Sequence, residues 1–302
     1  MLAEMDEPRE QWVTIAVGLD EARANELALV LIARGITHER RAGMSGVELW
    51  VPMESAGAAA SELAQYRKEN ARRVGTKHIA YVGNGWPGVA AYVAVLIAVF
   101  VATRESLLGL DWFGAGRFEA GAVAAGEWWR TVTALTLHLE FDHLGGNLVF
   151  GAFFGLFVGR YLGVGIGWLT VAATAAAANL VGAWVEAPEH RSLGASTAVF
   201  AALGLLVAYT WRRGFLRETP WRARIAPIVA GVGLLAFTGT AGENTDIGAH
   251  LLGFVAGFGG GLLLARGLRP IWLRNRRVQS ACAALALLLV VGAWAAGLYS
   301  AG

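Results

Sequence analysis

Residues 193–200 read LGASTAVF, and they place one serine, Ser196, among small residues at the start of a long apolar segment. Two other apolar segments also start with polar residues: one begins HLEFDHLGGN at 138–147, and the other contains AHLLGFVAG at 249–257. We expect the fold of the rest of the chain to bring the first residues of these three apolar segments together inside a membrane.

The composition is that of an integral membrane protein. Of the 302 residues, 56% are hydrophobic and only 16% are charged, whereas a soluble domain carries about 25% charged residues. Mean hydropathy is +0.49. The net charge of +2 gives no indication of nucleic-acid binding, and the one cysteine, Cys282, excludes an intrachain disulfide. We expect no nucleic-acid partner and no cofactor.

Residues 1–68 differ from the rest and predict a small soluble α+β domain. The pattern predicts strands at 12–18 and 46–52 and helices at 20–34 and 54–70, with Asp20 as N-cap and Gly35 as helix stop. This domain contains no cluster of catalytic residue types, so we expect an accessory or protein-contact role. A linker at 69–85 follows, with basic and glycine residues.

Residues 86–302 predict a membrane domain with a core at 86–266. Each of its apolar segments is near the ~17–25 residues that cross a bilayer. We place seven of them at 87–103, 143–160, 163–185, 193–211, 225–241, 247–265 and, as an additional C-terminal helix, 279–299.

The distribution of charge predicts the orientation of these segments. Arginines concentrate between the fourth and fifth segments and between the sixth and seventh, and basic residues also precede the first. The opposite loops are richer in acid, as at Glu186 and Glu189. The positive-inside rule therefore predicts a cytoplasmic N-terminus and an external C-terminus. The Ala- and Arg-rich composition indicates a bacterial inner membrane.

With this orientation, the second, fourth and sixth segments all enter from the outer face. His143 and Asn147 lie at the start of the second segment, Ser196 at the start of the fourth, and His250 at the start of the sixth. Polar groups within a span cost at least ~2–3 kcal/mol when charged at its centre, so their matched depth predicts a functional site.

The residue types suit nucleophilic catalysis. A serine hydroxyl needs a base to take its proton, and His250 is the candidate base. His143 and Asn147 share one helix face, and such donors stabilise an oxyanion by ~3–4 kcal/mol each in serine proteases. Asp246 is assigned to the loop, so the pattern predicts a Ser-His dyad without a third member.

Glycines predict how the helices pack. Gly253, Gly257 and Gly261 recur every four residues, and His250 lies three residues before the first of them. A small face of this kind lets another helix approach closely. The helix that carries Ser196, with Gly194 and its alanines, is the expected partner.

Four motifs together resemble the rhomboid family of intramembrane serine proteases. They are Trp129-Arg130, His138-x4-His143-x3-Asn147, Gly194-x-Ser196 and Ala249-His250-x2-Gly253-x3-Gly257. The resemblance covers about 87–265. The N-terminal domain also resembles the cytoplasmic domain of bacterial GlpG-like rhomboids, and the seventh span resembles the "6+1" layout of some members.

The resemblance implies an all-α polytopic membrane protein: a six-helix rhomboid bundle plus a seventh transmembrane helix, preceded by a small α+β cytoplasmic domain. It implies a serine endopeptidase that forms a covalent acyl-enzyme and cleaves single-pass membrane proteins in or near their transmembrane segments. Ser196 would be the nucleophile and His250 the base, with His143, Asn147 and the Ser196 backbone N–H as oxyanion hole.

The resemblance also implies supporting roles. His138 matches a histidine whose role is structural and hydrogen-bonding, Trp129-Arg130 matches a motif that braces the first loop, and 241–247 corresponds to a flexible cap. One residue departs from the pattern: Thr197 stands where the family usually has glycine after the nucleophile. A β-branched residue there could narrow the substrate channel or shift the oxyanion-hole backbone.

Two alternatives stay open. The first is an inactive rhomboid-like protein that binds membrane clients, which Thr197 alone favours. The second is a transporter, which would need polar residues at several depths and repeats that the sequence lacks. We expect no metal site, because the acidic and histidine residues at 138–143 lack the His-Glu-x-x-His spacing.

Overall fold

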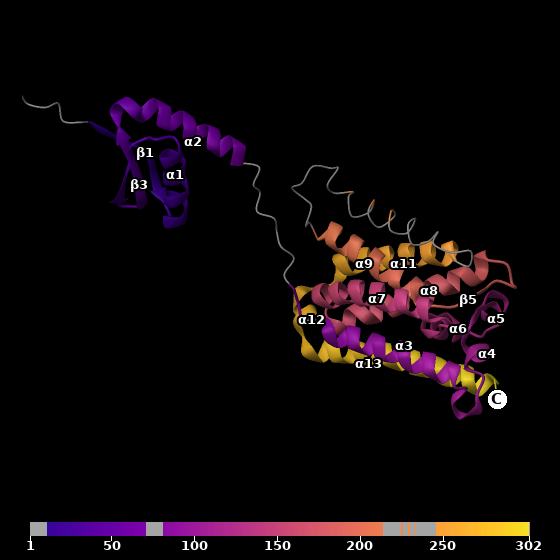
Figure 1. The fold of residues 1–302 in the computed structure, drawn as a ribbon. Coiled ribbons are helices and arrows are strands. Elements are labelled where there is room, and N and C mark those ends of the chain that lie inside the picture. The colour runs from indigo at the N-terminus through magenta and orange to yellow at the C-terminus, as the bar shows by residue number, and fades with distance from the viewer. Residues whose placement is uncertain are drawn as a thin grey trace, which may run out of the picture. The chain divides into compact units, whose positions relative to one another are not determined.

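The computed structural model describes residues 11–70, 81–213, 225, 229, 233 and 246–301. The chain forms two compact units, Met1–Gly75 and Thr76–Gly302, which Figure 1 shows as a ribbon. Nearly all of the predicted segment 225–241 and most of the predicted cap at 241–247 lie outside the described residues.

The N-terminal unit is an α+β fold, as predicted. It comprises β1 (Trp12–Leu19), α1 (Glu21–Ala33), β2 (Glu39–Gly43), β3 (Gly46–Pro52) and α2 (Ala56–Asn70), and its antiparallel sheet has the order β1-β3-β2. Asp20 caps α1 by accepting a hydrogen bond from the Arg23 N–H at 2.7 Å. Leu27, Leu31 and Leu49 are fully buried in its core. The strand β2, an edge strand of sequence ERRAG, was not predicted from the sequence.

The second unit is a bundle of long apolar helices, which confirms the predicted all-α polytopic membrane fold. Five helices of the described ranges are long and apolar enough to cross a membrane: α3 (Trp86–Arg104), α7 (Phe141–Leu162), α8 (Val164–Val185), α11 (Ile247–Gly267) and α13 (Arg276–Ala301). A sixth, α9 (Ser196–Arg212), has 17 residues. These helices coincide with six of the seven predicted segments, and the short α12 (Pro270–Arg274) precedes α13.

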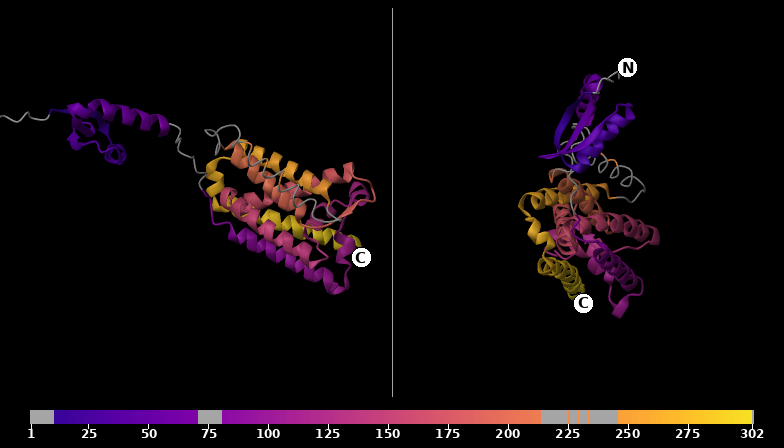
Figure 2. Two further views of the ribbon diagram at one scale, coloured as in Figure 1. Left: turned by 45° about the horizontal axis from the view of Figure 1, so that its top comes forward. Right: turned by 90° about the vertical axis from the view of Figure 1, so that its left-hand side faces the viewer.

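The helix α9 packs against α7, α8 and α11. Figures 1 and 2 show α9 beside α11, with α3 and α13 on the opposite side of the unit and α7 and α8 between the two sides. Almost every residue of α9 from Thr197 to Tyr209 is buried, and Leu205 joins Phe154, Val158 and Phe254 in one hydrophobic core. A buried helix of this kind gives the residues at its N-terminus a fixed position.

The segment between α3 and α7 is folded rather than extended. It contains the following short elements: η2 (Leu107–Gly109), α4 (Trp112–Gly116), β4 (Phe118–Glu119), α5 (Ala120–Ala124), α6 (Arg130–Thr133) and η3 (Ala134–Thr136). The strand β4 pairs with β5 (Arg191–Ser192). The last residue of β5, Ser192, lies four residues before Ser196. The first loop of the bundle is therefore bonded to the segment that leads into α9.

One glutamine joins α13 to the junction between α7 and α8. The side-chain amide oxygen of Gln279, Oε1, accepts hydrogen bonds from the backbone N–H groups of Gly165 (2.8 Å) and Ile166 (3.1 Å). Its amide nitrogen donates to the carbonyl oxygens of Leu162 (3.0 Å) and Leu273 (2.9 Å). A single side chain thus satisfies one orphan C=O at the end of α7 and two orphan N–H groups at the start of α8.

Replacing Gln279 with leucine is expected to lower the free energy of unfolding in detergent by about 2–4 kcal/mol, because buried backbone groups that lose their partners cost about 1–3 kcal/mol each. Thermal unfolding followed by circular dichroism measures the effect. Ser280→Ala, at the exposed neighbouring position of α13, is the matched control. Equal melting temperatures for the two variants would contradict the assignment.

Candidate active site

The N-terminal ends of three helices meet at one place. His143 and Asn147 lie in the first two turns of α7, Ser196 is the first residue of α9, and His250 lies in the first turn of α11. A Cβ built on Gly194 would lie 2.5 Å from Cε1 of His143, and one built on Gly253 would lie 2.5 Å from the Thr197 carbonyl oxygen. The starts of α7 and α11 are therefore both in close contact with the start of α9.

His250 packs against α9 one turn after Ser196. The centroids of the His250 and Phe200 rings are 4.6 Å apart, and the rings are tilted by 34°. Phe200 is four residues after Ser196, so the two side chains share one face of α9. His250 is buried, and its Nδ1 has no hydrogen-bond partner among the described residues. No hydrogen bond joins Ser196 to His250 within the described ranges.

Asp246 is engaged away from His250. Its Oδ1 accepts from the Ala249 N–H at 2.9 Å and caps α11, and its Oδ2 lies 2.8 Å from Nε2 of His190. Both carboxylate oxygens therefore have partners other than the His250 ring, and the Asp246–His190 contact ties the loop before β5 to the start of α11. This contact could not be predicted from the sequence, because its partners are 56 residues apart.

His138 accepts a hydrogen bond from the backbone beside Ser196. The Ala195 N–H donates to Nε2 of His138 at 3.3 Å, and the His138 side chain is fully buried. Burial lowers the pKa of His138 to about 4, and the neighbouring His143, whose ring centroid is 5.0 Å away, acts in the same direction. The ring is therefore neutral at physiological pH, and Nε2 stays available as an acceptor.

Gly194 occupies a position that suits no other residue. Its φ is +121°, which side-chain-bearing residues rarely adopt. Its N–H donates to the Ala134 carbonyl oxygen at 2.9 Å, and the His143 ring fills the space where a side chain would be. A side chain at residue 194 would displace His143.

Thr197 fits because Gly253 lacks a side chain. Thr197 is buried, and its Cγ2 lies 3.1 Å from the position that a Cβ on Gly253 would take. A Cβ on Gly257 would overlap the Ala201 carbonyl oxygen, and one on Gly261 would lie 2.5 Å from the Leu205 carbonyl oxygen. The predicted glycine face of the sixth segment thus packs directly on the backbone of α9.

Asn147 is buried, with its side chain turned toward its own helix. Its amide nitrogen donates to the His143 carbonyl oxygen at 3.0 Å, and its backbone carbonyl accepts from the Tyr92 hydroxyl at 2.8 Å. Asn147 and His143 are one turn apart on α7, as predicted, and the Tyr92 bond connects this turn to α3.

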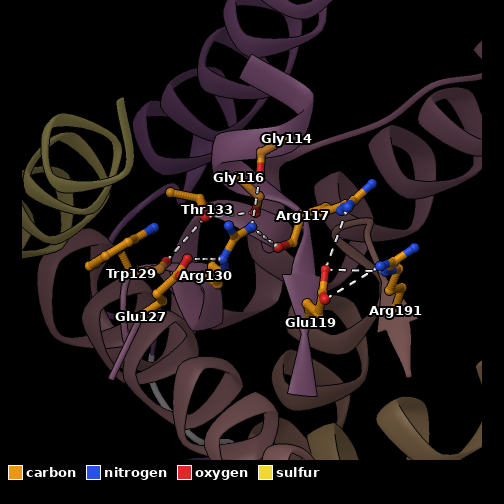
Figure 3. A network of polar contacts seen from close by, with 9 residues as sticks. All are labelled: Gly114, Gly116, Arg117, Glu119, Glu127, Trp129, Arg130, Thr133 and Arg191. Atoms are coloured by element: carbon orange, nitrogen blue, oxygen red, sulfur yellow. Dashed lines mark hydrogen bonds and ion pairs between the residues drawn. The ribbon is translucent and has the colours of Figure 1, made fainter. Parts of the chain in front are cut away.

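Arg130 holds the first loop through several bonds, which Figure 3 shows. Its Nε donates to Glu127 at 2.6 Å, and its Nη1 donates to the carbonyl oxygens of Gly114 and Arg117, both at 2.8 Å. The neighbouring Trp129 ring packs against Gly297 of α13. These contacts fit the predicted bracing by Trp129-Arg130, but the sequence analysis did not identify the partners.

Glu119 extends this network to β5. Its carboxylate accepts from Arg191 at 3.1 Å and lies 3.5 Å from Arg117 (Figure 3). The hydrogen bond from Arg191, together with the charges of Arg117 and Arg130, holds the pKa of Glu119 below its ordinary value. The ionised carboxylate therefore links the first loop to the segment that precedes Ser196.

A family model for the Rhomboid domain matches residues 125–267. The Rhomboid protease GluP of Bacillus subtilis is 34% identical over 187 residues, which are 61% of this chain and 35% of GluP. The Putative rhomboid protease YdcA of the same organism is 31% identical over 137 residues, which are 45% of this chain and 67% of YdcA. The chain belongs to the rhomboid family. This finding confirms the resemblance stated on the four motifs.

The rhomboid match extends beyond Bacillus. The Rhomboid-like protease 2 of Toxoplasma gondii is 28% identical over 215 residues, which are 64% of this chain and 68% of that protein. The aligned part spans about a third of GluP and two thirds of YdcA. The rhomboid model includes α7, α8, α9 and α11, whereas α3 and α13 lie outside it.

Among the described residues, no group of three or more His, Cys, Asp or Glu side chains is arranged to hold a metal ion. The site contains imidazole, hydroxyl, amide and backbone N–H groups, and these groups suit proton transfer and anion stabilisation.

Proposed function

We propose that the chain is an intramembrane serine protease with Ser196 as nucleophile and His250 as general base. The packing of the His250 ring on Phe200 carries the proposal, because Phe200 and Ser196 share one face of α9. The names of the relatives, which are rhomboid proteases, support the same activity. The absence of a Ser196–His250 hydrogen bond among the described residues is compatible with it, since catalytic hydrogen bonds often tighten only when substrate binds.

The proposed reaction has two steps. His250 takes the Ser196 proton as Oγ attacks the scissile carbonyl carbon, and His250 then gives this proton to the departing amine as the peptide bond breaks. Water next attacks the acyl-enzyme ester, with His250 again as base, and releases the acid product and free Ser196. The partners of Asp246 support a dyad rather than a triad.

The start of α9 suits an oxyanion hole. Ser196 is the first residue of the helix, where backbone N–H groups have no partner within the helix. The helix dipole also favours negative charge there. The Ala195 N–H is already bonded to His138, so the Ser196 N–H is the backbone donor that we assign to the oxyanion. We assign His143 and Asn147 as its side-chain donors.

We infer that the substrates are single-pass membrane proteins, cleaved in or near their transmembrane segments. The charge distribution supports a multi-pass protein of a bacterial inner membrane with its N-terminal unit in the cytoplasm and its C-terminus outside. In this orientation, the starts of α7, α9 and α11 lie near the outer face, where water for hydrolysis has the shortest path to Ser196.

The experiment that tests this function uses the full chain in liposomes with several single-pass membrane substrates and a fluorophosphonate probe. We expect cleavage of a substrate, and a probe adduct that mass spectrometry locates on Ser196. Ser192→Ala, which removes the neighbouring hydroxyl on β5, should leave both results unchanged. Folded protein that neither cleaves nor reacts would instead favour the alternative of a client-binding protein without protease activity.

A further inference from the structure

Trp294 connects α13 to the loop that precedes α7. Its side chain is buried, and its indole N–H donates to Oγ1 of Thr136 at 3.0 Å. Its ring lies against Trp112, with centroids 4.9 Å apart, and fills the space beside Gly116 that a Cβ would overlap. Figure 1 shows the C-terminal end of α13 beside α4, the helix that contains both of these partners. The hydrogen bond to Thr136 and the packing against Trp112 and Gly116 thus fix the position of the Trp294 indole.

Thr136 is fixed in turn by both of its hydrogen bonds. Its hydroxyl donates to the Thr133 carbonyl oxygen at 2.8 Å and accepts from Trp294. The next residue, Leu137, is fully buried and belongs to the same hydrophobic cluster as Trp294. Of the two residues that immediately precede His138, Trp294 thus bonds to Thr136 and shares a hydrophobic cluster with Leu137.

From His138 the contacts continue to the nucleophile. Nε2 of His138 accepts from the Ala195 N–H, and Ala195 directly precedes Ser196. A displacement of the 136–138 segment would move this acceptor and change the backbone at the start of α9. The series runs from Trp294 to Thr136 through a hydrogen bond, along the chain through Leu137 to His138, and from His138 to Ala195 through a second hydrogen bond.

The other end of α13 is also fixed. Gln279 binds the junction of α7 and α8 through three of the hydrogen bonds described above, and its fourth goes to Leu273 of α12. It precedes Trp294 by 15 residues, which corresponds to ~22 Å along a helix. Because Gln279 is bonded in this way, α13 resists sliding along its axis when Thr136 moves. Trp294 therefore holds the loop at Thr136 in a fixed position along the α13 axis.

We propose that Trp294 is a positioning residue for the proposed protease reaction. Its bond to Thr136 sets the position of His138 and, through Ala195, the backbone at Ser196. The inference rests on the proposed function and adds to it a role for α13, which lies outside the region matched by the family model. It predicts an effect on acylation of Ser196 rather than on substrate binding.

Trp294→Phe tests this role, because it keeps an aromatic ring and removes the N–H. Thr136→Val removes the acceptor from the same bond with little change in shape. In each variant we expect the rate of fluorophosphonate labelling and kcat to fall about 3- to 10-fold with KM unchanged, as for the loss of one hydrogen bond. The double variant should fall no further than Thr136→Val alone, since that change already removes the bond from Trp294 together with the bond to Thr133.

Trp272→Phe, at an exposed tryptophan of α12, is the control and should label at the wild-type rate. Three results would overturn the proposal: unchanged labelling in both variants, a lower melting temperature with unchanged kcat, or multiplied effects in the double variant. Failure of the wild-type protein to label would be a different result, because it would remove the proposed function on which this inference rests.

Discussion

Replacing His250 with alanine is expected to slow cleavage and fluorophosphonate labelling of Ser196 by about a thousandfold or more, because the hydroxyl then has no base to take its proton. The His250 ring packs on Phe200 of α9, and its Nδ1 has no hydrogen-bond partner among the described residues, so the bundle should stay folded. Labelling rates and kcat in liposomes measure the loss, and Ser196→Ala sets the lower limit. Retention of more than a tenth of wild-type activity would contradict the role of His250.

Asp246→Asn distinguishes a dyad from a triad. Asparagine keeps the oxygen that caps α11 at Ala249, and in a dyad we expect less than about a tenfold loss of kcat. Loss of the acid in a triad costs about ten thousandfold. A loss of that size for Asp246→Asn would show that the carboxylate leaves His190 and acts on His250 during the reaction.

Replacing Gly257 with leucine is expected to abolish the folded bundle. A Cβ at this position would overlap the Ala201 carbonyl oxygen, and backbone atoms cannot move aside as a flexible side chain can. The leucine would force α9 and α11 apart along their whole contact and separate His250 from Ser196. We expect loss of a monodisperse peak in size-exclusion chromatography and of all activity.

Gly259→Leu is the matched control for this change. It lies two residues further along α11, and a Cβ there meets nothing within 4 Å. We expect its elution, melting temperature and activity to stay close to those of the wild-type protein. If Gly257→Leu behaved in the same way, the close approach of α9 and α11 would not be required for folding.

The membrane helices and the packing of α9 on α11 could be predicted because each depends on a pattern within a short stretch of sequence. Long apolar runs define membrane helices, and glycines every four residues define a face that another backbone can approach. The strand β2 was missed for the opposite reason: it joins the sheet through backbone hydrogen bonds to β3, and its sequence ERRAG shows no apolar alternation.

The polar contacts around the site could not be predicted, since each joins residues far apart in the chain. Glu119 binds Arg191, and Asp246 binds His190, across 72 and 56 residues. A glutamine or tryptophan in an apolar run gives no indication of its partner, so the contacts of Gln279 and Trp294 emerged only from the fold. The departure at Thr197 also became intelligible only once its neighbour Gly253 was known.

The Gln279 contacts have a consequence for biogenesis. In chain order α13 follows every other described membrane helix, so it is synthesised last among them. Until it reaches the bilayer, the backbone groups of Leu162, Gly165 and Ile166 lack the partner that Gln279 supplies. The α7–α8 junction is therefore finished by a residue translated more than a hundred positions later. Maturation of the bundle is in this way coupled to synthesis of α13, and a product terminated before Gln279 would carry an incompletely bonded junction.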